Sequence, residues 1–305
     1  MFLEVAGEPW RLGVPEQWIT HVRQLFRHLV IDAAVSPGVA VELTDGPCSA
    51  SARAAAAAMR DYADPYASLA QRHADHVAHC SRMSYHAYRW ADRRGELALL
   101  RGELASMLLG TNLLLRHFAW RAMQRGMVPL HAAAIGGAGG FWLLPAGAGS
   151  GKSVTTAVAL SLGLEALGDD FVLWNPVDDT IHSLYCSVRL RPEGLELVRA
   201  HRPDFRWRTL GLRDDGKCIL QPDADGFRRR GALRGVLSWD QAGVTGPARA
   251  LKAFSSTSLL LRSIGYPSAE AFAPLAALAR RVTVRHLPPR APLHDLGREL
   301  QALCR

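Results

Sequence analysis

One octapeptide, Ala146-Gly-Ala-Gly-Ser-Gly-Lys-Ser153, constrains the fold of this chain more than any other feature. It follows the apolar run Phe141-Trp-Leu-Leu144 and precedes a helix-like run from Val154 to Leu162. Glycines in such a loop let successive backbone N–H groups turn inward around phosphate oxygens, and the helix that follows adds the positive end of its dipole. The order of strand, glycine-rich loop and helix therefore predicts a phosphate-binding loop, or P-loop.

The residue types of the loop assign its tasks. Lys152 can reach the β- and γ-phosphates of ATP, and the Ser153 hydroxyl can bind Mg²⁺. The usual pattern begins with glycine where this chain has Ala146, and the three glycines that follow supply the flexibility. The predicted nucleotide-binding residues are Gly147, Ala148, Gly149, Ser150, Gly151, Lys152, Ser153 and Val154.

Lysine usage supports this prediction. The chain contains only three lysines, Lys152, Lys217 and Lys252, and nearly all other positive charge is arginine. An ammonium group is a compact point charge, and the wide planar guanidinium does not replace it at a tight phosphate site.

Composition limits the class of protein. The 305 residues, 49% hydrophobic and 21% charged, are enough for one large or two smaller globular domains. The five cysteines are scattered without a CxxC pair, which fits a reducing compartment, so a cytoplasmic location is expected. We expect no signal peptide, because no basic region followed by an apolar stretch opens the chain. No segment reaches about 18 uninterrupted apolar residues, so no membrane partner is expected.

A net charge of +8 raises the question of a nucleic-acid partner. The densest basic region runs from Arg199 to Arg234, and it has few aromatic side chains on which bases could stack. Nucleic-acid binding is therefore disfavoured. Attraction of ATP or an acidic peptide is the better use of this charge.

Hydrophobic periodicity predicts an α+β module over residues 1–125. Its expected elements are a strand or hairpin over 1–13, an amphipathic helix from Pro15 to Val30, a strand from Val39 to Leu43, an irregular region over 45–75, a hairpin from Val77 to Leu99 and a long helix from Leu100 to Arg125. This module is expected to serve substrate recognition or assembly, and the linker is placed near Gly126.

A nucleotide-binding catalytic domain is predicted over residues 126–305. Its expected elements are a hairpin over 131–144, the helix after the loop, strands over 164–174, 181–190, 236–239 and 282–287, and helices over 255–264, 268–280 and 293–304. Residues 192–235 are polar and arginine-rich, so they are expected to form loops. Asp169 and Asp170 fall inside the strand over 164–174.

Three further residues flank the loop in a recognisable order. His131 lies on the strand before the hairpin, and Asp169-Asp170 lies on the strand after the loop's helix. This arrangement resembles the HPr kinase/phosphorylase family, and Gly168-Asp-Asp is similar to the metal-binding stretch of phosphoenolpyruvate carboxykinases of the same fold. The segment Ser183–Arg191 is similar to that of HPr-kinase-like tailoring enzymes, including kinases that phosphorylate serine in lasso-peptide precursors. The resemblance covers roughly residues 128–192.

The resemblance implies an α/β fold with a P-loop core of the HPr kinase/phosphoenolpyruvate carboxykinase type and a mixed sheet, after a smaller α+β module. It implies that Asp169 accepts the proton of the substrate hydroxyl and that Asp170 helps to hold Mg²⁺. Adjacent carboxylates on a strand point to opposite faces, which also favours different partners for the two. His131 is expected beside this pair, where it tunes or orients it.

Arg189 and Arg191 are candidates for neutralising charge on the transferred phosphoryl group. A purely structural role remains an alternative for each of these residues: a turn or structural ion pair for the aspartates, a core position for His131 and surface positions for the arginines.

Two departures from the HPr kinase pattern affect the expected substrate. The Glu-x-Arg-Gly stretch of that family is missing, and Tyr185–Leu190 occupies its place. Its basic phosphorolysis loop is not recognisable either. Both departures favour a relative that works in one direction on another substrate.

Two other groups of residues could bind an anion or a metal. Lys217 follows Arg213-Asp-Asp-Gly216, a predicted turn, and could reach a phosphate or the substrate, although a plain surface lysine is the simpler interpretation. The cluster of His73, His76, His79, Cys80 and His86 could bind a metal on a helix, but the alternation from Val77 to Trp90 indicates a strand that separates His76 from His79.

The leading hypothesis is therefore an ATP- and Mg²⁺-dependent kinase for a serine-type hydroxyl of a peptide or small protein, with a ribosomal precursor peptide as the foremost candidate. Phosphoryl transfer to a small molecule and a non-catalytic ATP-binding regulatory module remain as alternatives. HPr kinases assemble as hexamers, so the resemblance also suggests that this chain forms a homo-oligomer.

Overall fold

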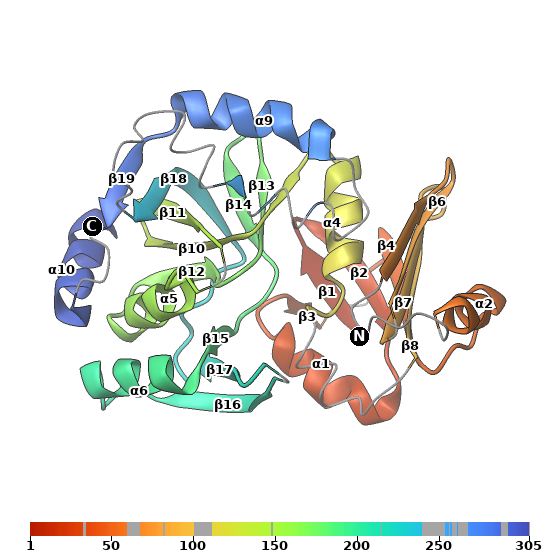
Figure 1. Ribbon diagram of the computed structural model, residues 1–305, viewed down its shortest axis with the longest axis horizontal. Helices are drawn as coiled ribbons and strands as arrows, with labels where there is room; N and C mark the ends of the chain where they lie inside the picture. The colour runs from red at the N-terminus through yellow and green to blue at the C-terminus, as the bar shows by residue number, and fades with distance from the viewer. Residues whose placement is uncertain are drawn as a thin grey trace. The chain divides into compact units, whose positions relative to one another are not determined.

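The computed structural model describes residues 1–32, 35–59, 68–81, 83–100, 112–147, 149–213, 215–239, 254–255, 257, 261, 268–287 and 292–304 (Figure 1). This described chain divides into two compact units, the first over Met1–Arg121 and the second over the described residues from Ala122 to Cys304. Each unit contains a large sheet with parallel and antiparallel neighbours. The fold is therefore mixed α/β, with large mixed sheets and few helices, as the sequence predicts at this level.

Within the described part of the first unit, eight strands form one sheet in the order β3-β1-β2-β4-β8-β7-β6-β5. The strands are β1 (Phe2–Val5), β2 (Glu8–Gly13), β3 (Val30–Ile31), β4 (Val39–Asp45), β5 (Ser68–Arg72), β6 (His76–Ser81), β7 (Ser84–Arg89) and β8 (Arg94–Leu99). Strands β2, β4 and β8 run parallel, and the other neighbours pair antiparallel. The hairpin over 1–13 and the strand from Val39 are confirmed.

The predicted helix from Pro15 to Val30 is shorter than expected. A 3₁₀ turn, η1 (Glu16–Trp18), leads into α1 (Ile19–Leu25), and turns then carry the chain to β3, which pairs with β1. The apolar face is nevertheless buried as predicted, because Trp18, Val22, Leu25, Phe26 and Leu29 are each at most 5% exposed. Phe118 completes this core with edge-to-face ring contacts to Trp10 and Phe26.

The irregular region predicted over 45–75 is corrected by the structure. It contains α2 (Ala50–Ala58) and β5. Alanine has the highest helix propensity, and the Ser49 side chain caps the helix by accepting a hydrogen bond from the N–H of Ala52 at 3.0 Å. The expected hairpin over 77–99 is a three-stranded meander, β6-β7-β8.

The long helix predicted from Leu100 to Arg125 is described only in its second half. There α4 (Leu115–Gln124) forms and runs through the boundary between the units. Residues 101–111 of that prediction lie outside the described residues.

The main sheet of the second unit, as far as it is described, has the order β12-β10-β11-β18-β14-β13-β9, with β19 beside β18. Its strands are β9 (Val128–Leu130), β10 (Ala132–Gly137), β11 (Gly140–Pro145), β12 (Glu165–Gly168), β13 (Val172–Asn175), β14 (Thr180–Ser183), β18 (Arg230–Trp239) and β19 (Val284–Leu287). The hairpin predicted over 131–144 is confirmed as β10 and β11. Strand β18 runs parallel to both β11 and β19.

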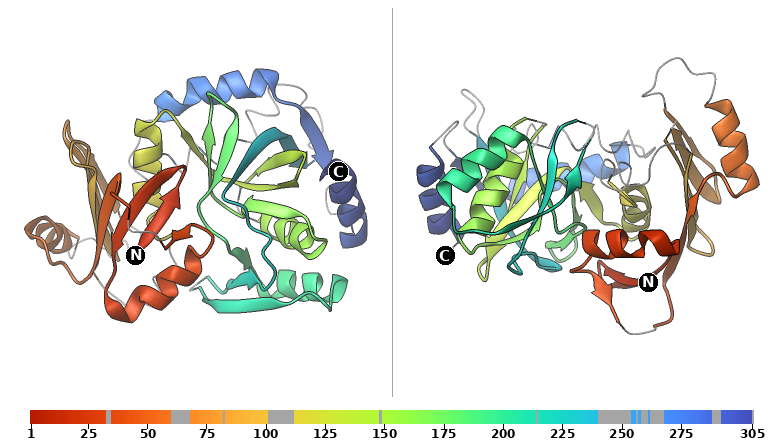
Figure 2. Two further views of the ribbon diagram at one scale, coloured as in Figure 1. Left: turned by 180° about the vertical axis from the view of Figure 1, so that it is seen from behind. Right: turned by 90° about the horizontal axis from the view of Figure 1, so that it is seen from below.

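Helix α5 (Lys152–Ser161) packs on β10 and β12 of this sheet, and α6 (Pro192–His201) and α10 (Leu293–Cys304) both contact α5 (Figure 2). Trp142, Leu144, Val158, Leu160 and Leu300 are buried together in the resulting core. A further helix, α9 (Ser268–Arg281), confirms the element predicted over 268–280. The helix predicted over 255–264 falls largely outside the described residues.

Three predictions for the second unit were wrong. The strand expected over 164–174 is two strands, β12 and β13, separated by a bend at 169–171. The strand expected over 181–190 is β14 of the main sheet and β15 (Val188–Leu190) of a second sheet. The loop expected over 192–235 contains α6, β16 (Trp207–Leu212), β17 (Cys218–Pro222) and the start of β18.

The second sheet has the strand order β15-β17-β16 and pairs antiparallel throughout. One of its faces contributes Val188, Leu190 and Leu220 to the core beneath α5. Across the described helices of both units, none combines the length and the apolarity that crossing a membrane requires.

Candidate functional site

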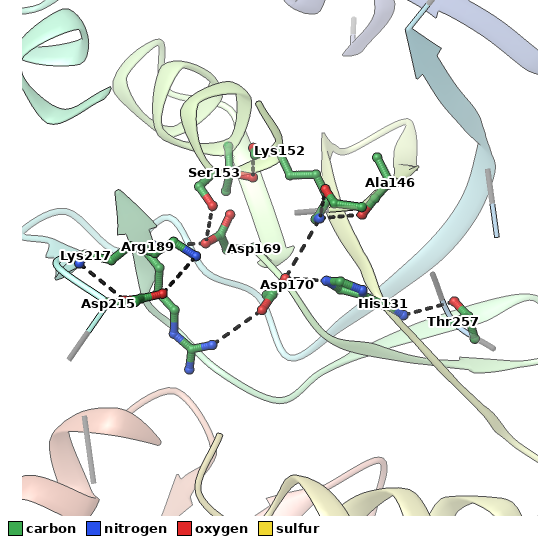
Figure 3. A network of polar contacts seen from close by, with 12 residues as sticks. His131, Ala146, Lys152, Ser153, Asp169, Asp170, Arg189, Asp215, Lys217 and Thr257 are labelled. Carbon is green, nitrogen blue, oxygen red and sulfur yellow. Dashed lines mark hydrogen bonds and ion pairs between the residues drawn. The ribbon is translucent and has the colours of Figure 1, made fainter. Parts of the chain in front are cut away.

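Strand directions bring the predicted site residues to one edge of the main sheet of the second unit. Because β10 runs antiparallel to both β11 and β12, the start of β10 lies beside the ends of the other two strands. His131 immediately precedes β10, the glycine-rich loop follows β11, and Asp169 follows β12. Residues from three separate stretches of sequence therefore meet (Figure 3).

The glycine-rich loop has the backbone that its composition predicts. Gly149 and Gly151 have φ angles of +77° and +96°, which favour glycine over residues with a Cβ. Gly151 is the N-cap of α5, so the loop ends at the positive end of the helix dipole. Ala148 lies outside the described residues. The half-buried side chain of Val154 packs on the core, so that residue can offer a ligand only its backbone.

Lys152 is 5% exposed, and its ammonium lies over the start of the loop. Its Nζ donates hydrogen bonds to the carbonyl oxygens of Ala146 at 2.5 Å and Gly147 at 3.1 Å. Burial lowers the pKa of Lys152, and the negative charges of Asp170 and Asp169 oppose that shift.

Asp169 is buried against the loop. Its Oδ2 accepts hydrogen bonds from the Ser153 hydroxyl at 3.0 Å and from the backbone N–H of Arg189 at 2.9 Å. Its Oδ1 is buried without a hydrogen-bond partner among the described residues. Burial, together with the charge of Asp170, raises the pKa of Asp169 to about 6.

Asp170 has different partners. Its Oδ1 lies 2.8 Å from Nε2 of His131, and its Oδ2 accepts a hydrogen bond from the Arg189 guanidinium at 3.5 Å. The Lys152 ammonium is 4.0 Å away. Burial alone would raise the pKa of Asp170, but the bond from His131 and the charge of Arg189 outweigh it and hold the pKa well below its ordinary value.

The His131 ring is fixed from two sides. It stacks on Phe171 with ring centroids 5.1 Å apart, and its backbone N–H donates to the Thr257 hydroxyl at 3.1 Å. A ring held in this way orients the Asp170 carboxylate. This is a positioning arrangement, and no local sequence signal indicates the contributions of Phe171 and Thr257.

The aspartate pair does not lie inside a strand, so the alternation of side chains along a strand does not explain why the two carboxylates have different partners. Strand β12 ends at Gly168, and the chain bends so tightly that a Cβ on this residue would lie 2.8 Å from the carbonyl oxygen of Phe171. The bend, and not the alternation of a pleated strand, points the two carboxylates at different neighbours.

The two predicted arginines behave differently. Arg189 is 8% exposed and contacts both aspartates, whereas Arg191 is exposed as the N-cap residue of α6. The Arg189 guanidinium also lies over the ring of Tyr185, 5.8 Å from its centroid. A small pocket opens beside the pair, lined by Asp169, Asp170, Phe171, Tyr185, Ser187 and Arg189.

Trp239 is a residue that sequence reasoning missed. It ends β18, which runs parallel to β11, so it emerges at the edge where the glycine-rich loop begins. A Cβ on Gly151 would lie 3.5 Å from its indole ring. The sequence signal that could have identified Trp239 is an aromatic residue at the end of a buried strand.

The histidine cluster lies in the first unit, on β6 and β7. His79 and His86 are buried register partners, and burial lowers the pKa of His79 to about 3, so its ring is neutral. His76 is half-buried and bonds to Asp75. No group of three His, Cys, Asp or Glu side chains arranged to hold a metal occurs in the described ranges of either unit.

Mg²⁺ at the aspartate pair would not require such a group. Mg²⁺ bound with a nucleotide needs only one or two protein carboxylates, because phosphate oxygens and waters complete its shell. The two predicted ligands have different partners, since the Ser153 hydroxyl bonds to Asp169 whereas Asp170 bonds to His131 and Arg189. Both are hard oxygen ligands of the kind that Mg²⁺ prefers, and Oδ1 of Asp169, unpartnered among the described residues, adds another acceptor. The residues present therefore fit a magnesium nucleotide.

Comparison with known proteins assigns no family. Neither the protein-family models nor the curated proteins give a match to this sequence.

Proposed function

We propose that this chain is an ATP- and Mg²⁺-dependent kinase that transfers the γ-phosphoryl group to a serine-type hydroxyl of a peptide or small protein. One observation carries the proposal: the last two residues of the glycine-rich loop meet an aspartate pair, with the Ser153 hydroxyl 3.0 Å from Asp169 and the Lys152 ammonium 4.0 Å from Asp170. Phosphoryl transfer is mostly positioning and charge stabilisation, and this arrangement offers both.

In this proposal the second unit has a P-loop core of the HPr kinase/phosphoenolpyruvate carboxykinase type. Backbone N–H groups of the loop bind phosphate oxygens, and the buried Ser150 hydroxyl, which has no partner among the described residues, adds one more donor. Ser153 and Asp170 hold Mg²⁺, which when bound neutralises charge on the phosphates. Residues 1–125 would recognise the substrate or support assembly.

Asp169 is the proposed general base. A carboxylate with a pKa of about 6 is largely ionised at neutral pH and is more basic than an ordinary aspartate. It takes the proton of the acceptor hydroxyl as the hydroxyl oxygen attacks the γ-phosphorus, and the bond between that phosphorus and the β–γ bridging oxygen breaks, so that ADP leaves. Asp170 stays ionised because its pKa is low, and His131 orients it. The Arg189 guanidinium neutralises charge that builds up on the phosphoryl group.

The pocket beside the pair is small. It is lined by both aspartates and by the rings of Phe171 and Tyr185, and it has room for about one water-sized group. It could take the hydroxyl group of an acceptor next to the pair, and it does not by itself distinguish serine from other hydroxyl-bearing side chains.

Intact-mass analysis of candidate peptides incubated with the full chain, ATP and Mg²⁺ tests the proposal. A gain of one phosphoryl group is expected, and Lys152→Ala should abolish it. Asp169→Asn should lower the rate by at least about 100-fold, in the range of general-base effects. The exposed Arg208→Ala serves as a control that leaves the rate unchanged.

Two results would count against the proposal. Wild-type transfer rates in Asp169→Asn would show that Asp169 is not the base. Tight ATP binding with no phosphorylated peptide would favour a small-molecule acceptor or a regulatory module instead.

A further inference from the structure

Trp239 lies beside the glycine-rich loop, on the side away from the aspartate pair. The strand order β12-β10-β11-β18 places β11, which leads into the loop, between the strands that carry these two groups (Figure 1). Asp169 follows the end of β12, and Trp239 ends β18. Neighbouring strands lie about 4.8 Å apart, so the ends of β12 and β18 are roughly 14 Å apart across the sheet. The loop therefore has carboxylates on one side and an indole on the other.

The indole borders both ends of the loop. Strands β11 and β18 run parallel, and continuing their register by three residues places Trp239 level with Ala146, where the loop begins. A Cβ on Gly151, where the loop ends, would lie 3.5 Å from the indole. By contrast, Cβ atoms on Gly147 and Gly149 would meet no described atom within 4 Å. A ligand on the loop would thus have the indole as a wall on one side.

The ring of Trp239 is available for stacking. Two other aromatic rings near the site already have partners, since Phe171 stacks on His131. The Arg189 guanidinium lies over Tyr185. Trp239 is half-buried against the core, and it has no ring or cation partner among the described residues. A partly exposed aromatic ring is the kind of surface on which a nucleobase stacks.

The chemistry on the two sides of the loop orients the ligand. On one side, the aspartate pair and Arg189 suit Mg²⁺ and a charged phosphoryl group. On the other side, Trp239 pairs with the buried Leu287 of β19, so apolar side chains end both strands. A nucleoside triphosphate has the same division, with charged phosphates at one end and an uncharged base at the other.

We propose that Trp239 is the base-stacking residue of the nucleotide site. The adenine lies against its indole, and the phosphates cross the loop so that the γ-phosphoryl group reaches the aspartate pair. This inference rests on the proposed nucleotide site and deepens it. It gives the site a direction, with the nucleoside toward β18 and the reacting phosphorus toward β12.

Base stacking acts only on a ligand that carries a base. Calorimetric binding of a non-hydrolysable ATP analogue and of inorganic triphosphate to the full chain, each with Mg²⁺, uses this difference. Trp239→Ala should weaken binding of the ATP analogue about 10-fold, within the usual range for base–aromatic stacking, and leave inorganic triphosphate unchanged. The corresponding GTP analogue should lose a similar factor, because every base presents a π-face to the ring.

Two further variants separate stacking from packing. Trp239→Phe keeps an aromatic ring and should restore most of the affinity for the ATP analogue. Trp239→Leu keeps an apolar side chain against the core but has no ring, so it should bind the analogue as weakly as Trp239→Ala. Trp207→Ala is the matched control, because Trp207 packs on the same core from β16 of the second sheet, and it should leave both affinities unchanged.

Three results would overturn the stacking role and leave the kinase proposal standing. They are equal weakening of both ligands by Trp239→Ala, no weakening of either, and full affinity for the ATP analogue in Trp239→Leu. Failure of the wild-type chain to bind either ligand would overturn the kinase proposal as well.

Discussion

At the scale of single residues, Asp169 and Asp170 show how environment divides two identical side chains. Asp169 is buried with one unpartnered oxygen, which raises its pKa, whereas Asp170 is bonded by His131 and Arg189, which lowers its pKa. Neighbouring carboxyls whose pKa values are pushed apart are a recurring basis for separate acid–base roles.

Asp169 should make the protein less stable as the pH rises. Its pKa is about 6 in the folded chain against 3.8 for an ordinary aspartate, so the folded state holds the proton more tightly. Its contribution to stability is complete below pH 3.8 and is lost as the pH rises through about 6. At pH 8 Asp169→Asn should therefore be more stable than the wild type by about 3 kcal/mol.

Denaturant unfolding of both proteins between pH 4 and pH 8 measures this difference. The gap should shrink toward zero at the acidic end, and a gap that stays constant with pH would contradict the raised pKa. The pH dependence of kcat/KM gives a second reading. It should rise with pH around a midpoint of about 6, because the base must be ionised.

At the scale of secondary-structure elements, the bend between β12 and β13 decides where the carboxylates point. Gly168 permits it, because its missing Cβ leaves room for the carbonyl oxygen of Phe171. Gly168→Ala should destabilise the protein by about 1–3 kcal/mol, the usual cost of forcing an atom into a filled space. It should also weaken nucleotide binding, since Asp169 would shift away from Ser153.

Chemical unfolding tests the Gly168 prediction against a matched variant. Gly147→Ala places the same methyl group where no atom lies within 4 Å, and it should change stability by less than about 0.5 kcal/mol. Equal losses in the two variants would show that the bend does not depend on Gly168.

The elements around the site also show what the sequence can and cannot reveal. The hairpin β10–β11 and helix α5 follow from local signals, the glycine turns and the glycine-rich loop, so they were predicted correctly. The break at 169–171 was missed because apolar residues continue on both sides of it. Only the pairing of β12 with β10 and of β13 with β9 separates the two strands.

The arginine-rich region was misread for a related reason. Residues 192–235 look like loop because polar residues dominate, but α6 needs to bury only Leu195 and Val198, and every residue of β16 is half-buried or exposed. Elements that bury so few side chains keep most of their positions polar. Within the site, local sequence predicted His131, Lys152, Ser153 and the aspartates, whereas Phe171, Thr257 and Trp239 are identified only by their contacts in the folded chain.

At the scale of the whole molecule, the positive charge of the chain is the feature that acts over distance. The net charge is +8, and the exposed ion pairs that do form, such as Arg11 with Glu42 and Arg202 with Asp204, leave many arginines in excess. Exposed pairs of this kind contribute little to stability. The arginines in excess of the carboxylates are better understood as the source of a positive field that attracts anions.

This field should make the capture of an acidic peptide depend on salt. The Debye length falls from about 30 Å at 0.01 M to about 8 Å at 0.15 M ionic strength, so attraction over longer distances disappears in that interval. With saturating nucleotide, kcat/KM for an acidic acceptor peptide should fall roughly 10-fold, within the range of electrostatic steering, while kcat stays constant. A neutral peptide of the same length and acceptor residue is the control and should lose much less. An equal loss for both peptides would mean that salt acts on the site itself, and a loss confined to kcat would mean that the charge of the whole molecule plays no part in bringing the acceptor to it.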